Sequence, residues 1–227
     1  MKGAFIQTEM SGTPVYVKCT GKLRDHVLET FPELSQYVGT DRVLYGVLRK
    51  ALYGCVQASK LWFEELTSFL KRVGYINSEV EPCVFRKIDG GHVHLLVVYV
   101  DDILMIVSKG EMERLHKLFV EEFRWITMDV SKEQSYLAMQ ISFLLNEVRI
   151  DMRSYIDKIL TAFGRELVQY QNPGRKDLFT VKEESELKDD KARVFHTVVA
   201  KLLYLAKRAR PDIMTVLLMY MGEGSNY

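Results

Sequence analysis

Apolar residues recur at helical spacing in four segments of this chain. The predicted helices cover residues 57–73, 108–123, 154–163 and 193–207. Gly74 and Gly164 are expected to end the first and third helices, and Ser154 is expected to cap the third. In the second helix the spacing places Glu111 on the polar face, opposite the apolar residues.

Short apolar runs bounded by turn residues predict antiparallel hairpins. The expected strands cover residues 83–88, 93–99, 103–107, 135–144 and 148–152. Asp89-Gly90-Gly91 has the composition of a hairpin connector. The next reversal places Asp101 and Asp102 at the tip of a hairpin with apolar strands on both sides. Helices mixed with antiparallel strands predict an α/β (α+β) fold.

A charged stretch interrupts the pattern between residues 165 and 192, where apolar periodicity is lost and Lys, Glu and Asp accumulate. Such a composition is typical of a solvated linker. We therefore expect three segments, covering residues 1–164, 165–192 and 193–227.

The composition narrows the class of protein only a little. The 227 residues are 48% hydrophobic, which is enough for a substantial core, and 31 basic against 30 acidic residues leave a net charge of +1. A nucleic-acid partner would therefore have to be bound by local basic patches. The three cysteines are widely spaced and predict neither a disulfide framework nor a zinc site.

The same features predict an intracellular, soluble protein. The N-terminus lacks the pattern of a signal peptide. The longest apolar run, residues 93–107, is interrupted by His94, Asp101 and Asp102, so no membrane segment is expected.

Adjacent aspartates at the end of an apolar strand are the main chemical signal. Like charges a few ångströms apart repel each other, and a divalent cation removes that cost. Mg²⁺ prefers carboxylate oxygens and substrate phosphates as ligands, which is the arrangement that nucleotidyl transfer requires. The alternative is an ordinary solvent-exposed turn, because Asp is common in turns. The apolar flanks of Asp101 and Asp102 favour the metal site.

Several segments together resemble the reverse transcriptases of Ty1/copia-type retrotransposons, and they occur in the same order. Residues 99–104, YVDDIL, match the signature of that family. Residues 50–63, KALYGCVQASKLWF, resemble its K-A-L-Y-G-L-K-Q-A-P-R-x-W-Y motif. Residues 135–141, SYLAMQI, resemble S-Y-L-G-M-Q-I, with Ala138 in place of Gly, and residues 204–213 resemble L-Y-L…R-P-D-I.

This resemblance implies a reverse-transcriptase palm with an antiparallel sheet and packed helices, a partial thumb or connection, and fingers that are largely missing. The implied activity is RNA-directed DNA polymerase, with Asp101 and Asp102 catalytic and bound to Mg²⁺ or Mn²⁺. The implied partners are an RNA or DNA template-primer, deoxynucleotides and the integrase and RNase H of a Pol polyprotein. The implied location is the cytoplasm, in virus-like particles, or the nucleus.

The resemblance also assigns residues to the substrate sites. Those expected to line the nucleotide site are Phe5, Tyr53, Gly54, Gln57 and Tyr99, and those expected to contact nucleic acid are Lys50, Lys60, Ala138 and Gln140. Phe5 would exclude a ribose 2′-hydroxyl, although it could equally be a core aromatic. Trp62 falls among apolar helical positions and is expected in the core rather than stacked on a base. Lys50 and Lys60 could simply belong to a solvated face.

The first residues match the end of the family's D-[VM]-K-G-A-F motif, whose Asp is the third metal ligand. Met1 occupies the position after that Asp, so we expect a truncated start, with the Met1 backbone carbonyl offered to the metal. Two other functions stay open. One is an inactive remnant or nucleic-acid-binding module, and the other is an unrelated metal-dependent enzyme that uses Asp129 or Asp151 as an additional acid.

Overall fold

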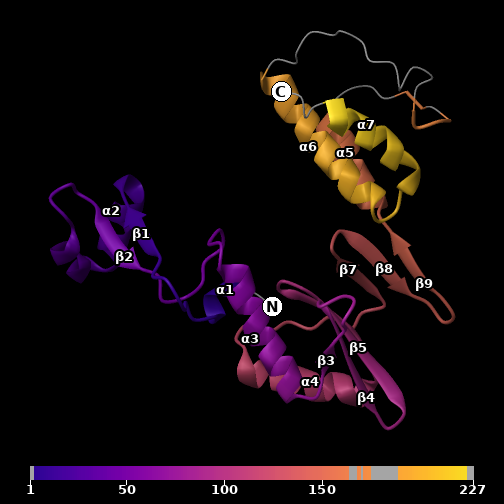
Figure 1. Ribbon diagram of the computed structural model, residues 1–227, viewed down its shortest axis with the longest axis horizontal. Coiled ribbons are helices and arrows are strands. Elements are labelled where there is room, and N and C mark those ends of the chain that lie inside the picture. The colour runs from indigo at the N-terminus through magenta and orange to yellow at the C-terminus, as the bar shows by residue number, and fades with distance from the viewer. Residues whose placement is uncertain (1–2, 164–167, 170, 175–188, 224–227) are drawn as a thin grey trace. The chain divides into compact units, whose positions relative to one another are not determined.

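The structure is a computed structural model that describes residues 3–163, 168–169, 171–174 and 189–223 (Figure 1). It divides into two compact units, Met1–Met128 and Asp129–Tyr227, which are described separately here. Met1 and most of residues 165–188 lie outside the described residues, and with them the predicted metal contact of Met1 and most of the predicted linker. The described helices include none that is long and apolar enough to cross a membrane.

The first unit combines a four-stranded antiparallel sheet, a two-stranded sheet and helices. In chain order its described elements are α1 (Ala4–Gln7), β1 (Tyr16–Cys19), α2 (Gly21–Thr30), η1 (Pro32–Tyr37), β2 (Leu44–Val47), α3 (Ala58–Arg72), β3 (Ile76–Asn77), β4 (Val84–Asp89), β5 (His92–Tyr99), β6 (Asp102–Ile106) and α4 (Lys109–Glu122). The larger sheet has the order β3-β4-β5-β6, and β1 pairs only with β2. The mixed α/β fold with antiparallel sheets is confirmed.

The core of this unit lies between the larger sheet and the helices α3 and α4. Leu66 and Leu70 of α3 and Leu115 of α4 are fully buried, as are the cross-strand partners Phe85 and Leu96. Trp62, Phe69, Phe119 and Phe123 add a cluster of ring contacts between the two helices. The predicted helix 57–73 is therefore confirmed, and Gly74, at φ 99°, ends it.

The N-terminal part contains more regular structure than its weak sequence pattern predicted. Strands β1 and β2 pair in antiparallel register from Tyr16 with Val47 to Cys19 with Leu44, and helix α2 lies between them in the chain. Helix α2 has no buried residue, so burial does not impose a strong apolar periodicity on its sequence. This is why hydrophobic spacing missed it.

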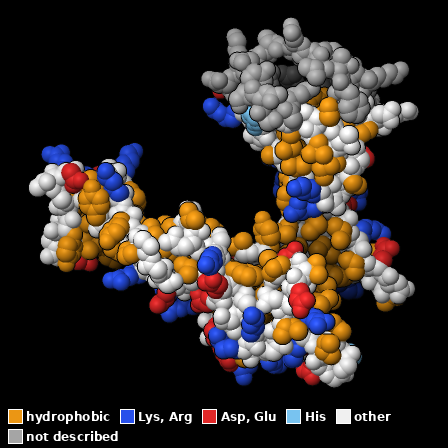
Figure 2. All heavy atoms as spheres, viewed as in Figure 1, with side chains coloured by type: hydrophobic (Ala, Val, Ile, Leu, Met, Phe, Trp, Pro, Cys, Tyr) orange, Lys and Arg blue, Asp and Glu red, His pale blue; other side chains and the backbone are white. Residues whose placement is uncertain are grey.

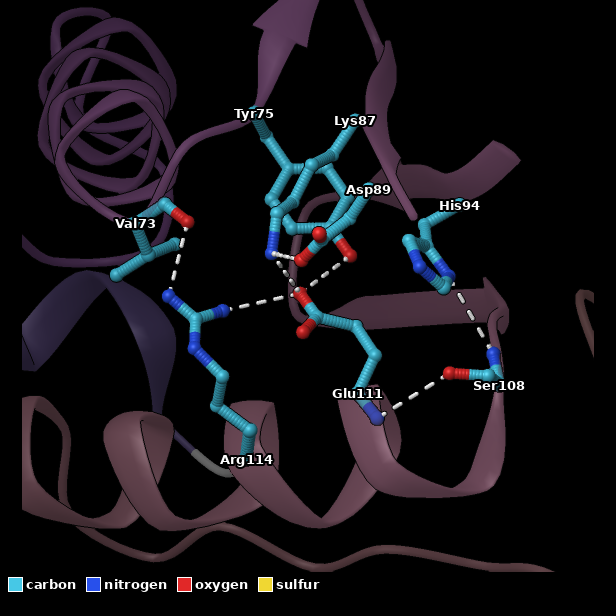
Figure 3. A network of polar contacts seen from close by, with 8 residues as sticks. All are labelled: Val73, Tyr75, Lys87, Asp89, His94, Ser108, Glu111 and Arg114. Atoms are coloured by element: carbon cyan, nitrogen blue, oxygen red, sulfur yellow. Dashed lines mark hydrogen bonds and ion pairs between the residues drawn. The ribbon is translucent and has the colours of Figure 1, made fainter. Parts of the chain in front are cut away.

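Glu111 is buried, and its predicted place on the polar face of α4 is wrong. One carboxylate oxygen, Oε1, accepts hydrogen bonds from the Tyr75 hydroxyl at 3.1 Å, Lys87 Nζ at 3.2 Å and Arg114 Nη1 at 3.0 Å (Figure 3). Burial and the Glu111 carboxylate raise the pKa of Tyr75, which keeps the hydroxyl protonated as a donor. Helical periodicity cannot reveal such a network, because its partners come from other elements.

The first turn of α4 is fixed at a second point beside this network. Ser108 caps the helix, since its side chain accepts a hydrogen bond from the Glu111 backbone N–H at 3.4 Å. The Ser108 backbone N–H in turn donates to Nδ1 of His94, a side chain that is 3% exposed on β5 (Figure 3). This contact joins the start of α4 to β5.

Charges of both signs cover the surface of the first unit. Figure 2 shows Lys and Arg side chains interspersed with Asp and Glu side chains over the part that contains α3 and α4. Arg72 of α3 pairs with Glu122 of α4 across the two helices, and Lys60 pairs with Glu64 one turn along α3. This mixture agrees with the net charge of +1.

In the second unit the predicted strand 135–144 is broken into two strands. The described elements of this unit are β7 (Glu133–Tyr136), β8 (Met139–Phe143), β9 (Val148–Asp151), α5 (Arg153–Phe163), α6 (Asp189–Ala206), η2 (Pro211–Ile213) and α7 (Met214–Glu223). Leu137 and Ala138 form the turn between β7 and β8, with positive φ angles of 49° and 61°. Neither residue is typical of such a turn, which is why turn chemistry did not predict it.

A contact from α6 supports this unusual turn. The Tyr204 hydroxyl donates to the Leu137 carbonyl at 2.6 Å. The Tyr204 ring packs against Tyr155, with centroids 5.3 Å apart, and Arg208 lies over it at 3.5 Å. The smaller core of this unit, which contains Met152, Ile159, Val198 and Leu205, lies beside these rings.

Two helix starts in the second unit differ from the prediction. Helix α5 begins at Arg153, so Ser154 lies inside it, and the Asp151 carboxylate accepts the Arg153 backbone N–H at 2.7 Å instead. That hydrogen bond is the main reason why the pKa of Asp151 is lowered. Helix α6 begins at Asp189, inside the predicted linker, because a helix can extend into a charged segment where one side faces solvent.

Replacing Glu111 should weaken the first unit. Glu111→Ala removes the acceptor shared by Tyr75, Lys87 and Arg114, and should lower the free energy of unfolding by about 1–3 kcal/mol, since the buried Tyr75 hydroxyl loses its acceptor. Lys87 keeps its ion pair with Asp89, and Arg114 keeps its hydrogen bond to the Val73 carbonyl. Chemical denaturation followed by circular dichroism measures this loss. Glu113→Ala, at an exposed position of the same helix, is the matched control. Equal stability of the two variants would contradict the importance of the network.

Replacing Ala138 by glycine should stabilise the second unit. Alanine at φ 61° occupies the left-handed region, which glycine adopts without steric cost. We expect Ala138→Gly to raise the free energy of unfolding by about 0.5–1 kcal/mol, because the relieved strain exceeds the extra entropy of the unfolded glycine chain. Thermal denaturation measures this change, and Ala200→Gly, at an exposed position in the middle of α6, should act in the opposite direction.

Candidate active site

The turn between β5 and β6 carries the two aspartates, as the sequence predicted. Tyr99 pairs with Asp102 at the end of the register, so Val100 and Asp101 are the central residues of a two-residue turn. Asp101 is half-buried and Asp102 is exposed. The two carboxylates therefore belong to adjacent residues at the end of a sheet whose other positions, such as Leu96 and Val98, are anchored in the core.

Val100 has a strained backbone at the first central position of this turn. Its φ angle is 54°, a region that β-branched residues rarely adopt, whereas Asp101 does not have a positive φ. A positive φ at the first central residue alone is the pattern of a type II′ turn, in which glycine is usual. The left-handed conformation costs a non-glycine residue about 1–2 kcal/mol, so surrounding contacts must maintain it.

One of these contacts comes from Trp62. Its indole Nε1–H donates a hydrogen bond to the Val100 carbonyl at 2.7 Å. The Trp62 side chain is 2% exposed and packs edge-on against Phe123, with ring centroids 5.3 Å apart. Its expected core position is confirmed, but sequence periodicity gave no sign that its N–H reaches the aspartate turn.

Phe5 and Tyr53 lie together beside the aspartates. Their ring centroids are 4.3 Å apart, and Phe5 is 5% exposed whereas Tyr53 is 55% exposed. The pKa of Tyr53 is raised, first by partial burial and then by the negative charges of Asp101 and Asp102. The Tyr53 hydroxyl thus lies within electrostatic reach of both carboxylates, and four of the predicted site residues are brought together.

Gly54 and Gln57 lie in the segment that leads from Tyr53 into α3. Gly54 has a φ angle of 94°, which favours glycine, although a side chain there would meet no other atom within 4 Å. Conformation, not space, therefore explains this glycine. Gln57 precedes the first residue of α3 and is half-buried. Tyr99 is 54% exposed on the strand end beside Asp102.

The two predicted basic contacts are already engaged within the chain. Lys50 Nζ donates to the Gln7 carbonyl at 3.1 Å and lies 3.6 Å from the Glu9 carboxylate. Lys60 lies 3.8 Å from the Glu64 carboxylate, and both side chains are largely exposed. Weak exposed ion pairs of this kind can exchange for phosphate contacts.

The other predicted nucleic-acid contacts, Ala138 and Gln140, belong to the second unit. Both are exposed, Ala138 in the turn after β7 and Gln140 on β8 between Ser135 and Asp151. Asp151 is engaged by Arg153, and Asp129 accepts the Ser131 backbone N–H at 2.9 Å. Both of these carboxylates therefore have structural partners within the second unit.

The turn offers a divalent cation the right kind of ligand, although in small number. Asp101 and Asp102 supply hard carboxylate oxygens, which suit a cation that also keeps water or phosphate ligands. Within the described ranges, no three His, Cys, Asp or Glu side chains gather closely enough to hold a metal ion together. Two carboxylates alone would need further oxygen ligands to complete the coordination of such a cation.

Neutralising the two aspartates should lower the pKa of Tyr53. In the Asp101→Asn, Asp102→Asn variant the pKa should fall but stay above its usual value, because burial is the larger cause. Titration followed by ¹³C NMR of tyrosine labelled at Cζ measures it. Asp41→Asn is the positive control. Asp41 accepts a hydrogen bond from the Tyr45 hydroxyl and raises the pKa of Tyr45, so this replacement should lower the pKa of Tyr45. An unchanged Tyr53 titration in the double variant would place its hydroxyl away from the carboxylates.

Comparison with known proteins identifies the family of this chain. Residues 4–171 match the family described as reverse transcriptase (RNA-dependent DNA polymerase). The chain is 27% identical over 206 residues to the retrovirus-related Pol polyprotein from transposon TNT 1-94 of Nicotiana tabacum, covering 85% of this chain and 15% of that protein. It is 40% identical over 105 residues to the Pol polyprotein from transposon RE2 of Arabidopsis thaliana, covering 44% and 7%.

A shorter relative matches nearly the whole chain. The putative transposon Ty5-1 protein of Saccharomyces cerevisiae is 29% identical over 222 residues, which cover 92% of this chain and 64% of that protein. No solved structure matches. The chain thus spans a small part of the Pol polyproteins, and it belongs to the reverse transcriptase (RNA-dependent DNA polymerase) family of Ty1/copia-type retrotransposons.

Proposed function

We propose that this chain supplies the aspartate-bearing palm for RNA-directed DNA synthesis, in which nucleotides are added to a primer. The observation that carries the proposal is the juxtaposition of Asp101 and Asp102 with Tyr53 and Phe5. The carboxylates lie at the end of a hairpin whose strand β5 is anchored in the core, and Tyr53, which packs against Phe5, lies within their electrostatic reach. Such a site can combine a cation, held by the carboxylates, that binds phosphates with an apolar surface that contacts a nucleoside.

The chemistry follows from the two carboxylates and their fixed turn. Members of this family generally use divalent metal ions, and we propose that Asp101 and Asp102 hold Mg²⁺ or Mn²⁺. When bound, such an ion neutralises charge on the transferring phosphoryl group and orients the attacking hydroxyl. The protein's own contribution is to hold both carboxylates on one rigid strand end, so that little reorganisation is needed.

The aromatic pair would define the nucleotide side of the site. Phe5 is buried and presents little surface of its own, so Tyr53 contributes the exposed face of the pair. Phe5 packs against Tyr53, and we propose that the two rings together border the nucleotide sugar. Gly54 and Gln57 continue this border toward α3.

The proposed partners are an RNA or DNA template-primer, deoxynucleotides and the remainder of a Pol polyprotein, such as the integrase and RNase H regions. Two of the relatives described above are Pol polyproteins, which supports the proposed polyprotein. We further propose that the protein acts inside the cell, in cytoplasmic virus-like particles or the nucleus. The free state of Cys19, Cys55 and Cys83 is compatible with that setting.

Primer extension on poly(rA)/oligo(dT) with Mg²⁺ tests the proposal. Asp101→Asn, Asp102→Asn should reduce extension by about a hundredfold or more, because the proposed cation loses both carboxylates. Asp157→Asn, at an exposed position of α5, is the matched control and should retain activity. Equal signal from the double variant and the unaltered protein would reject catalysis at this turn. Template-primer binding without extension would instead favour the nucleic-acid-binding alternative.

A further inference from the structure

The hydrogen bond from Trp62 to Val100 suggests a role for a residue that lies beneath the site. We propose that Trp62 is a positioning residue, whose indole N–H holds the Val100–Asp101 peptide in the orientation that presents both carboxylates to a divalent cation. This inference rests on the proposed function, because it concerns the same cation. It assigns the geometry of the turn to a side chain on α3 rather than to the turn sequence.

The hydrogen bond joins a buried donor, which requires an acceptor, to the Val100 carbonyl. An indole N–H is only a donor, and a donor that is buried requires an acceptor. Trp62, at 2% exposure, finds it in the Val100 carbonyl, 2.7 Å away. The ring is fixed by its edge-on contact with Phe123, at an interplanar angle of 66°. The donor is therefore held in place by the core and not by the turn that it contacts.

The acceptor is the peptide whose orientation controls the aspartates. The Val100 carbonyl belongs to the same peptide plane as the Asp101 N–H, so rotation of this plane moves the Asp101 backbone. Val100 has a φ angle of 54°, which valine does not favour, and relaxation would rotate this peptide. A hydrogen bond to its carbonyl opposes that rotation. Without it, the turn would populate other conformations, which present the two carboxylates in other directions.

A purely structural role for Trp62 would predict something different. If the ring only filled the core beside Phe123 and Leu66, losing the N–H while keeping the ring would leave the turn and its cation affinity unchanged. If the N–H positions the turn, the same change should disturb Val100 and the cation while leaving the core intact. The two roles can therefore be separated by removing only the N–H group.

The experiment uses the full chain with Trp125→Phe, which leaves Trp62 as the single tryptophan. Trp125 is 57% exposed, so its replacement also serves as the matched control. Trp62 is then replaced by 3-benzothienylalanine, in which sulfur takes the place of the N–H group. Trp62→Phe is prepared as a second variant. Unchanged methyl signals from Leu66 and Leu115 show that the core is retained, so the isostere decides the question if the phenylalanine variant does not fold.

Two quantities are measured by NMR: the ¹³C shift of the Val100 carbonyl, and Mg²⁺ affinity from the Asp101 and Asp102 amide signals. Loss of the N–H should shift the Val100 carbonyl signal and weaken Mg²⁺ binding by about fivefold, the change expected from one neutral hydrogen bond. Trp125→Phe alone should leave both unchanged. An isostere with unaltered Val100 shift and Mg²⁺ affinity would overturn the positioning role.

The Asp101→Asn, Asp102→Asn variant separates this failure from failure of the proposed function. If Mg²⁺ affects the turn in the unaltered protein and not in this variant, the cation site exists, and the isostere alone decides the role of Trp62. If Mg²⁺ leaves the turn signals of the unaltered protein unchanged, both the cation site and the positioning role are overturned.

Discussion

The packing of α3 against the four-stranded sheet is the constraint on which the first unit depends. Residues of α3 that are fully buried, such as Leu66 and Leu70, share one core with β4, β5 and α4. The same helix begins directly after the segment of Tyr53 and Gly54, and its first turns carry Trp62. One helix thus connects the core, the border of the nucleotide site and the aspartate turn. Displacing α3 would disturb all three.

The two units stabilise a strained turn in the same way. Each contains a tight turn that places non-glycine residues at positive φ, Val100 in one and Leu137 with Ala138 in the other. In each, a buried or half-buried aromatic side chain on a helix donates to the carbonyl of the first such residue, Trp62 to Val100 and Tyr204 to Leu137. Strain in the backbone is thus maintained by a donor from a distant part of the chain.

The sequence predicted the elements with strong periodicity and the position of the two aspartates at a hairpin turn, because both are local properties. It placed α3, α4 and the hairpin β5–β6 correctly, and the family motifs identified Asp101 and Asp102. It missed α2, which has no buried residue, and the break at Leu137. It also misplaced Glu111, whose burial depends on Tyr75, Lys87 and Arg114. The break at Leu137 and the burial of Glu111 depend on tertiary partners, which can override local pattern, whereas α2 lacks the buried face that periodicity detects.

The strand β5 is held near both of its ends, and this determines where the chain can change length. His94 contacts Ser108 near its start, and Val100, directly after its end, contacts Trp62. A single residue inserted between these points would turn alternate side chains to the opposite face and carry one anchor away from its partner. In the part of the chain that the structure describes, the Gly90-Gly91 turn has no such anchor. A side chain added at either glycine would meet no other atom within 4 Å. Insertions and deletions among related elements should therefore accumulate there, and a peptide tag could be accommodated there without altering the aspartate turn.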